Sequence, residues 1–526
     1  MKYRRSSGII LHPTSLPGPY GIGDLGPQAL NWVDFLAKTG CGLWQILPLG
    51  PTGYGDSPYQ CFSAFAGNPY LISPELLFED KLLAQSDLGG MPGFPSGRVD
   101  FGAVIPWKLA LLDKAYTRYE KSASAQLQEA HREFQEQQSG WLEDFALFMA
   151  LKEYHGGAPW ITWSPDLRDR KPKALSEAQK KLTDSIQRQI FRQFIFFRQW
   201  SALRKCTAEK NIRIIGDIPI FVAHDSADVW AHPELFTLDQ TGKPEFVAGV
   251  PPDYFSPTGQ LWGNPLYGWE VHKANGYTWW LERMRAVLSL VDIVRLDHFR
   301  GFAGYWKVKG DAKTAEKGQW VPGPGRDFFD TLQEALGDLP IIAEDLGVIT
   351  PDVVAMRETY QLPGMKILQF AFAGGPDDPF LPHHYPENCV VYTGTHDNDT
   401  VRGWYERVPE EEKSFYRRYM HRDGSNVSWD LIWSCWGSVA IFALAPLQDF
   451  LGLGNEARMN YPGNPSGNWT WRMREDSLGE SLQEQVHEIN YLYSRMNIAE
   501  GEDAESAVPE DYFDIPEAPL PPASPA

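Results

Sequence analysis

Eight short apolar segments, several of them separated by segments with helical patterns, constrain the fold of this chain more than any other feature. They are residues 8–12, 43–49, 213–220, 292–297, 340–345, 364–370, 389–394 and 438–444. Each is apolar almost throughout, as expected of strands that are covered on both faces in a parallel sheet. Eight such strands with intervening helices predict an α/β fold, a (β/α)8 TIM barrel, with a doubly wound sheet as the structural alternative.

Two of the intervening segments carry clear helix signals. Residues 28–40 place apolar side chains along one stripe and end at Gly40, which is a common helix terminator. Residues 350–360 begin with Thr350 at the expected N-cap and Pro351 in the first turn. Each segment lies between two predicted strands, as the barrel requires.

Two gaps between strands are too long for plain crossover connections. Residues 102–210 are mostly charged and helix-forming, which predicts a mainly helical insertion after the second strand. Residues 221–276 are rich in Pro, Gly and aromatic residues. Long irregular loops in compact domains are usually functional or disordered, and this many aromatic side chains argue against disorder. We therefore expect residues 1–499 to form one barrel domain, in which residues 221–276 contribute a functional loop.

The net charge of −20 limits the possible partners. Residues 500–526 contain eight acidic residues, six prolines and no Lys or Arg, so they carry −8 and leave a body near −12. Such a segment has too little apolar area to order itself, and we predict a disordered acidic tail. The acidic body disfavours nucleic acid and anionic membrane as partners, because both attract basic patches.

The cysteines and the apolar stretches bear on the compartment. Five cysteines lie far apart without a Cys-x-x-Cys pair, which favours a reducing compartment over a disulfide framework. The start of the chain has an apolar run of only four residues, too short for a signal peptide. The longest apolar stretch, residues 436–447, falls short of the roughly 20 residues that a membrane helix needs. We therefore expect a cytoplasmic protein.

Motifs for nucleotides and metals are weak or missing. Gly21, Gly23 and Gly26 match G-x-G-x-x-G, but about nine residues with three prolines separate them from the preceding strand. A sharp loop explains these glycines better than a dinucleotide site. His383 and His384 have no partner at ligand spacing, and neither a P-loop nor an H-E-x-x-H motif is present.

Four acidic residues lie at the C-terminal ends of predicted strands. They are Asp217, Asp297, Glu344 and Asp397, which lie at or just beyond the C-terminal ends of the third, fourth, fifth and seventh strands. In a barrel these strand ends meet on one face, where active sites are found. A single acid at such a position often caps the next helix. Four of them, three beside another polar or charged residue, favour a functional cluster.

In a chain without nucleotide or metal motifs, clustered carboxylates are typical of acid and nucleophilic catalysis at a glycosidic bond. Arg295 lies two residues before Asp297 on the same face of the strand, where its charge would keep Asp297 ionised as a nucleophile. Burial and nearby carboxylates would raise the pKa of Glu344, as a general acid needs. Asp397 and His396 are placed to bind sugar hydroxyls and to stabilise positive charge at the anomeric carbon.

Several longer motifs resemble a known family. The strand segments RIIGDIPI, VRLDHFRGF, IIAEDLG and GTHDND are similar to conserved regions of the α-amylase clan. More specific are HPTSLPGPYGIGDLG, GDSPYQCFSAFAGNPYL, GVPPDYFSPTGQLWGNPLY and GNWTWR, which resemble the amylomaltase family of 4-α-glucanotransferases, also called disproportionating enzymes. The resemblance runs from about residue 7 to residue 495. It implies a catalytic TIM barrel without the C-terminal β-domain of amylases, and only a helical segment and the tail follow the last predicted strand.

The resemblance also implies an activity and the residues that carry it. The enzyme would cleave α-1,4 bonds of maltooligosaccharides, amylose and related glucans, and transfer the glycosyl unit to a glucan or glucose acceptor with retention. Asp297 would be the nucleophile, Glu344 the acid/base and Asp397 the transition-state stabiliser, with no cofactor and no metal. The positions expected to bind the substrate or support the reacting bond are Arg295, His396, Asp217, Ser57, Tyr59, Gln260, Trp262 and Asn468, with Tyr254 and Phe255 in a loop over the substrate.

The residues alone leave two other functions open. A retaining α-1,4-glucan hydrolase uses the same carboxylates, because the glycosyl-enzyme intermediate can pass to water instead of to a second sugar. The aromatic segment 221–276 favours acceptor binding, and therefore transfer. A non-catalytic glucan-binding protein is disfavoured, because the full set of carboxylates is present.

Overall fold

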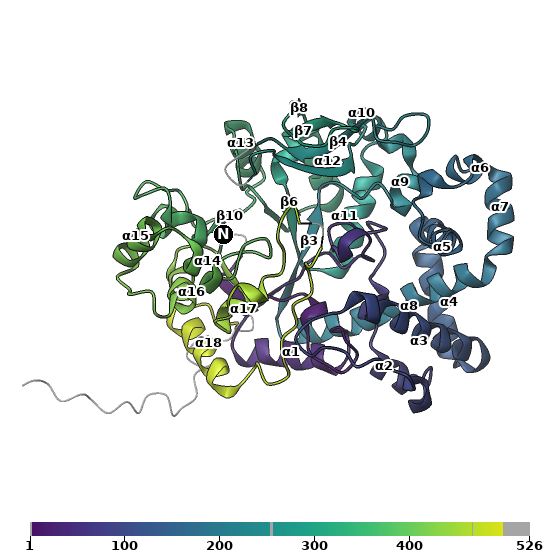
Figure 1. Cartoon of the computed structure of the whole chain (residues 1–526), viewed down its shortest axis with the longest axis horizontal. Helices are drawn as coiled ribbons and strands as arrows, with labels where there is room; N and C mark the ends of the chain where they lie inside the picture. Colours follow the sequence, from purple (N-terminus) through teal and green to yellow (C-terminus); the bar gives the residue numbers. More distant parts are fainter. Residues whose placement is uncertain (1–2, 253–255, 465, 498–526) are drawn as a thin grey trace, which may run out of the picture.

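The computed structural model describes residues 3–252, 256–464 and 466–497, and its centre is a barrel of eight parallel strands (Figure 1). The strands are β1 (Ser6–Ile10), β2 (Leu43–Gln45), β3 (Arg213–Pro219), β6 (Ile293–Asp297), β9 (Ile341–Ala343), β10 (Gly364–Ile367), β11 (Cys389–Tyr392) and β12 (Phe442–Pro446). Neighbours in chain order pair from β1 to β9 and from β10 to β12, and β12 pairs with β1. Beside β9 and β10, the Ala343 N–H donates to the Pro363 carbonyl oxygen at 2.9 Å, so the barrel is nearly closed. The predicted (β/α)8 barrel is confirmed, and the doubly wound sheet, whose first and last strands stay apart, is excluded.

The barrel strands are buried on both faces, which explains their apolar sequences. Ile293 belongs to a cluster of buried side chains contributed by all eight strands, which fills the barrel. The next residue, Val294, belongs to the larger cluster formed with the surrounding helices. Because alternate residues of a strand share a face, Arg295 and Asp297 continue the inner row at the C-terminal end of β6.

Helices cover the outside of the barrel (Figure 1). They include α1 (Pro27–Lys38), α11 (Thr278–Leu290), α12 (Gly325–Leu336), α13 (Pro351–Thr359), α14 (Val401–Arg407), α15 (Glu410–Met420), α16 (Val427–Gly437), α17 (Leu447–Phe450) and α18 (Glu480–Leu492). Helices α1 and α13 occupy the segments predicted from their start and stop signals. The chain leaves α1 through Gly40, which has a φ of +70°, and Thr350 is the N-cap of α13.

The segment between β2 and β3 is mainly helical and lies on the right of Figure 1. Its helices are α2 (Pro74–Glu79), α3 (Phe101–Ser122), α4 (Ala125–Gln137), α5 (Ser139–Tyr154), α6 (Pro165–Arg168), α7 (Pro172–Lys181) and α8 (Thr183–Glu209). The long α8 contacts α3, α4, α5 and α7 and leads directly into β3. The 102–210 segment therefore forms a helical layer that is anchored on the barrel through α8.

Residues 221–276, expected as an aromatic loop, contain regular structure. This segment holds α9 (Ala227–Ala231), β4 (Phe246–Val250), β5 (Gln260–Pro265) and α10 (Trp269–Ala274). Strand β4 pairs with β5 and with β7 (Gly304–Lys309), and β7 pairs with β8 (Gly318–Pro322), which gives a four-stranded antiparallel sheet. Two of its four strands, β7 and β8, follow β6 in the sequence. The sequence of residues 221–276 alone therefore does not reveal the pairing. The sheet lies at the top of Figure 1, above β6.

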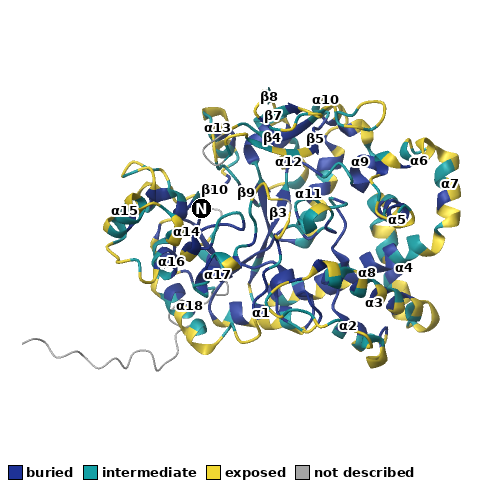
Figure 2. Cartoon of the chain, in the orientation of Figure 1, coloured by how far each residue is buried: buried dark blue, intermediate teal, exposed yellow. Residues whose placement is uncertain are grey.

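Burial is greatest in the barrel and where the helices meet it, whereas α6, α7 and α15 at the margins expose much of their surface (Figure 2). Within the described ranges, no helix has the length and apolar character needed to cross a membrane. The predicted acidic tail, residues 500–526, lies outside the described residues.

Candidate active site

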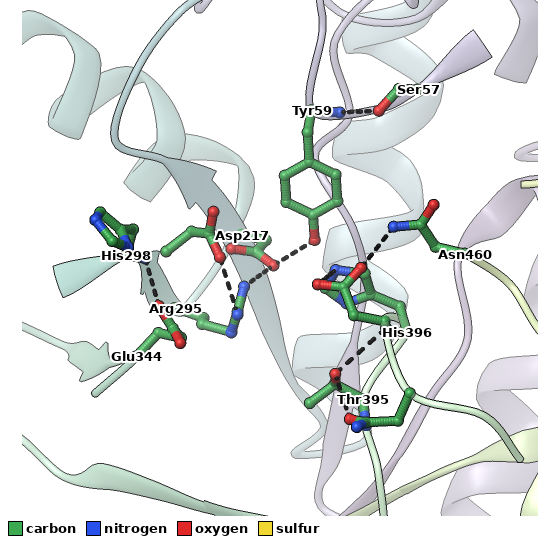
Figure 3. Close-up of polar contacts among 12 residues, drawn as sticks. Ser57, Tyr59, Asp217, Arg295, His298, Glu344, Thr395, His396 and Asn460 are labelled. Atoms are coloured by element: carbon green, nitrogen blue, oxygen red, sulfur yellow. Dashed lines mark hydrogen bonds and ion pairs between the residues drawn. The ribbon is translucent and has the colours of Figure 1, made fainter. Parts of the chain in front are cut away.

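The four acids predicted from the strand ends gather at the C-terminal end of the barrel, as Figure 3 shows for two of them, Asp217 and Glu344. Asp217 lies near the end of β3, Asp297 ends β6, and Glu344 directly follows β9. Asp397 lies in the loop between β11 and α14. Three of the four positions therefore follow from the register of neighbouring barrel strands, in which Asp217 pairs with Arg295.

Arg295 links two of these carboxylates. Its Nη1 donates to Asp217 Oδ2 at 2.5 Å, and its Nη2 lies 2.9 Å from Asp297 Oδ1. The Tyr59 hydroxyl donates to the same Asp217 oxygen at 2.7 Å. The Asp217 side chain is fully buried, whereas that of Asp297 is 29% exposed. Asp217 thus holds Arg295 and Tyr59 in place, and Asp297 is the carboxylate of this group that faces the open side.

Glu344 is fixed by the backbone that follows β6. Its Oε2 accepts the His298 N–H at 2.7 Å, and its own N–H donates to the Leu296 carbonyl oxygen at 3.1 Å. His298 has a φ of +52°, in the left-handed region that residues other than glycine rarely adopt. This strained turn points an N–H group at Glu344 directly after the nucleophile candidate Asp297. The carboxyl group is therefore oriented by strand register and one unusual backbone conformation.

Asp397 is held from the opposite side of the barrel. Asn460 Nδ2 donates to its Oδ1 at 2.6 Å, and Arg458 Nη2 donates to its carbonyl oxygen at 2.7 Å. The second carboxylate oxygen lies 3.4 Å from His396 Nε2. The Asp397 side chain is 46% exposed, so it remains accessible to a ligand while its position is fixed.

Burial dominates the electrostatics of the pair Asp297 and Glu344. It raises the pKa of Asp297 to about 7, with Asp217 and Asp397 adding to the rise and Arg295 opposing it. The sequence-based prediction considered only Arg295 and therefore gave the opposite direction. Burial and the negative charge of Asp297 raise the pKa of Glu344 well above its usual value. Asp297 has a guanidinium partner and Glu344 has only one backbone N–H, so Asp297 is the first of the two to ionise.

Aromatic rings line the site next to these carboxylates. Tyr59 stacks on His396 with ring centroids 5.0 Å apart, and Trp469 lies 5.7 Å from Tyr59. Burial is the main cause that raises the pKa of Tyr59 and lowers that of His396. Tyr59 therefore stays a hydroxyl donor and His396 stays neutral. The Trp262 ring meets the His298 ring edge-on, with centroids 4.8 Å apart.

The side chains of the other described residues predicted to bind the substrate form their hydrogen bonds with neighbouring residues of the chain rather than with the four acids. Ser57 Oγ accepts the Tyr59 N–H at 3.2 Å and so shapes the turn that presents Tyr59. On β5, Trp262 Nε1 donates to Gln260 Oε1 at 3.2 Å, which ties the two side chains together. The Asn468 amide is occupied within its own loop, because it accepts the Tyr461 N–H and donates to the Asn464 carbonyl oxygen. Tyr254 and Phe255 lie outside the described residues.

Sequence reasoning missed Arg458 and Asn460. Both lie in the loop after α17, well beyond the end of β12, and neither is an acid, so they do not belong to the pattern of acids at strand ends. The only local signal was an Asn and an Arg among turn-forming residues, which is common in loops. Within the part of the chain that the structure describes, no three His, Cys, Asp or Glu side chains gather as a metal site would require.

Comparison with known proteins identifies the family. A family model for glycoside hydrolase family 77, described as 4-alpha-glucanotransferase, matches residues 11–478. The chain belongs to this family. The 4-alpha-glucanotransferase of Thermus thermophilus is 53% identical over 486 residues, which cover 91% of this chain and 96% of that protein. The chloroplastic/amyloplastic 4-alpha-glucanotransferase of Solanum tuberosum is 45% identical over 503 residues, covering 94% and 87%.

The fold of this family 77 protein also has solved counterparts. The amylomaltase from Streptococcus agalactiae, solved in complex with acarbose, has a TM-score of 0.91 and 39% identity, and the match covers 94% of this chain and 100% of that one. The amylomaltase from Corynebacterium glutamicum has a TM-score of 0.76 at 19% identity and shows the shared fold. The predicted enzyme class, 4-α-glucanotransferase, is confirmed by the family, and the hydrolase alternative is not favoured.

Proposed function

We propose that this family 77 enzyme transfers α-1,4-linked glucosyl units by a retaining double displacement in which Asp297, Glu344 and Asp397 act on the substrate. The observation that carries the proposal is the arrangement of two unlike carboxyl groups at the barrel mouth. Asp297 is paired with Arg295, whereas Glu344 accepts, from the described residues, only the His298 N–H and holds its proton more strongly. A retaining mechanism needs such a pair, one group ionised and one protonated.

In the first step, an Asp297 carboxylate oxygen bonds to the anomeric carbon while the glycosidic C–O bond breaks. Arg295 engages Oδ1, which leaves Oδ2 for this attack. Glu344 transfers its proton to the departing 4-oxygen of the leaving sugar, so that the leaving group departs as a neutral alcohol. The products of this half-reaction are a covalent glycosyl-enzyme and a shortened glucan with a new non-reducing end.

In the second step, Glu344 as carboxylate removes a proton from the 4-OH of an acceptor glucan or glucose. The acceptor oxygen attacks the anomeric carbon from the face that the leaving group vacated, the bond to Asp297 breaks, and the configuration is retained. Asp397, next to neutral His396, supplies negative charge where the sugar becomes positively charged in both steps. Tyr59 and Trp469 offer aromatic faces beside the reacting sugar.

Incubation with pure maltotriose tests this function. Transfer predicts free glucose and a ladder of longer maltooligosaccharides at a constant number of reducing ends. In H₂¹⁸O, transfer products contain no label, whereas hydrolysis places ¹⁸O at the new reducing end. A reducing-end count that rises in step with substrate consumption would refute the transferase proposal and favour a hydrolase.

We further propose a cytoplasmic role in the metabolism of maltooligosaccharides, starch or glycogen. All five cysteines are free thiols, three of them buried, which suits a reducing compartment. Fractionation of cells that express the native gene tests the location; recovery of the activity outside the cytoplasmic fraction would refute it.

A further inference from the structure

One buried carboxylate clamps both ends of the loop that carries His396 and Asp397. This group is Asp449 in α17, the short helix that directly follows β12. Its Oδ2 accepts the Thr393 hydroxyl at 2.6 Å, and its Oδ1 accepts the Val401 N–H at 2.8 Å. Asp449 is fully buried, so it reaches neither solvent nor a bound sugar.

The two partners of Asp449 mark the limits of the loop. Thr393 follows the last residue of β11, and Val401 is the first residue of α14. Between them, Asn398 Oδ1 accepts both the N–H of Thr395, at 2.8 Å, and its hydroxyl, at 2.9 Å. The loop is thus cross-linked inside by Asn398 and closed at its base by Asp449.

In the observed arrangement the clamp uses two acceptor oxygens, which a carboxylate supplies. The Val401 N–H can only donate, and the Thr393 hydroxyl donates in the observed arrangement, so both contacts need acceptor oxygens. An asparagine offers one acceptor and one NH₂ group. Its oxygen would keep the contact with the Val401 N–H, but the Thr393 contact would survive only if the hydroxyl turned to accept from the NH₂ group. Because a buried carboxylate is costly without strong partners, its presence here indicates that both contacts matter.

We propose that Asp449 is a positioning residue that sets His396 and Asp397 at the distance from Asp297 that the transition state requires. The inference deepens the proposed function and rests on the role given there to Asp397. Asp449 acts through the loop and touches no substrate. The expected consequence of its loss is a slower chemical step at nearly unchanged ground-state binding, because small misplacements of catalytic groups cost large factors in rate.

The test compares Asp449→Asn with a matched control, Asp430→Asn. Asp430 is also a carboxylate with two contacts, to the Tyr416 hydroxyl and to Arg422, but it lies in α16 and holds no residue of the loop. We expect Asp449→Asn to lower kcat on maltotriose about 30-fold with KM within about threefold. Asp430→Asn should stay within about threefold in both. Equal kcat losses in the two variants would show that Asp449 is merely structural and would overturn the proposal.

A double-mutant cycle on acarbose binding separates this inference from the function on which it rests. Calorimetry gives the dissociation constants of wild type, Asp449→Asn, Asp397→Asn and the double variant. If Asp449 acts through Asp397, its substitution weakens acarbose at least about tenfold in the wild type but less than about twofold in the Asp397→Asn background. Additive effects would overturn the inference, whereas wild-type transfer by Asp397→Asn would overturn the proposed function itself.

A milder variant keeps the proposal testable if Asp449→Asn does not fold. Thr393→Val removes one hydroxyl donor at almost constant volume and leaves the Val401 contact intact. It should lower kcat about three- to tenfold at unchanged KM. A stable Thr393→Val enzyme with wild-type kcat would contradict the clamp.

Discussion

The carboxylates on one side of the site stand on barrel strands, whereas the one on the other side stands on a loop. Asp217 and Asp297 belong to β3 and β6, and Glu344 directly follows β9, so their spacing is set by sheet register. Asp397 belongs to the β11–α14 loop and depends on Asn460 and on contacts from distant chain segments. The strand side, Asp217, Asp297 and Glu344, is held by the backbone hydrogen bonds of the barrel. The loop side, Asp397, is held by side-chain contacts. We therefore expect substitutions among Asp217, Arg295, Asp297 and Glu344 to lower kcat strongly. Substitutions of the residues that hold Asp397 should lower kcat less, because they only displace its carboxylate.

The largest effect is expected from Asp297→Asn. The amide cannot form the glycosyl-enzyme, so kcat on maltotriose should fall at least about 10⁴-fold. The variant should bind acarbose and melt near the wild-type temperature, since the amide oxygen still accepts from Arg295. Transfer activity within tenfold of wild type would show that Asp297 is not the nucleophile. The barrel strands would then not supply the nucleophile through this residue.

Arg295→Gln should lower kcat about 10²–10³-fold and shift the pH profile. Burial raises the pKa of Asp297 to about 7 and Arg295 opposes that rise, so removing the guanidinium raises the pKa further. The proposed nucleophile must be ionised, and the acidic limb of kcat/KM therefore moves to higher pH. Arg295→Lys keeps the charge and should leave the acidic limb closer to that of wild type. An acidic limb that stays in place in Arg295→Gln would contradict this account.

Asn460→Ala tests the loop side and should have a smaller effect. It removes the hydrogen bond to Asp397 Oδ1, a contact to a charged group, and should lower kcat about tenfold. Asn464→Ala is the control, because Asn464 lies in the same loop with its side chain exposed. If both variants lose activity equally, general disorder of the loop explains the effect better than the lost contact.

The smallest effect is expected from His298. His298→Ala keeps the backbone N–H that binds Glu344 and loses the packing of the ring against Trp262 and Gly301, so kcat should fall less than about threefold. Since His298 has a left-handed conformation, His298→Gly should melt at a higher temperature than His298→Ala. A large loss of kcat in both His298→Ala and His298→Gly would show that the imidazole itself takes part.

The sequence predicts the strand side of the site better than the loop side. Acids at or near the ends of apolar runs predict Asp217, Asp297 and Glu344, because strand register brings such residues together, and the same pattern predicts Asp397 on the loop side. Asn460 and Asp449 carry no comparable signal, since their roles depend on which loops meet in space. The antiparallel sheet was not predicted for the same reason, because β4 pairs with β7 although β5 and β6 lie between them in the sequence. The direction of the Asp297 pKa shift was also missed, because burial is a property of the assembled barrel.

The pairing of β1 with β12 has a consequence for biosynthesis. Ser6 pairs with Phe442, so β1 receives this second neighbour only after the 436 residues from Ser6 to Phe442 (442 − 6) have been added to the chain. At about 5–20 residues per second, that interval is roughly 20–90 s. During this time β1 is an unpaired strand edge, which is a template for aggregation. Chains truncated before β12 would therefore be expected to accumulate as insoluble material, even though they contain Asp297, Glu344 and Asp397.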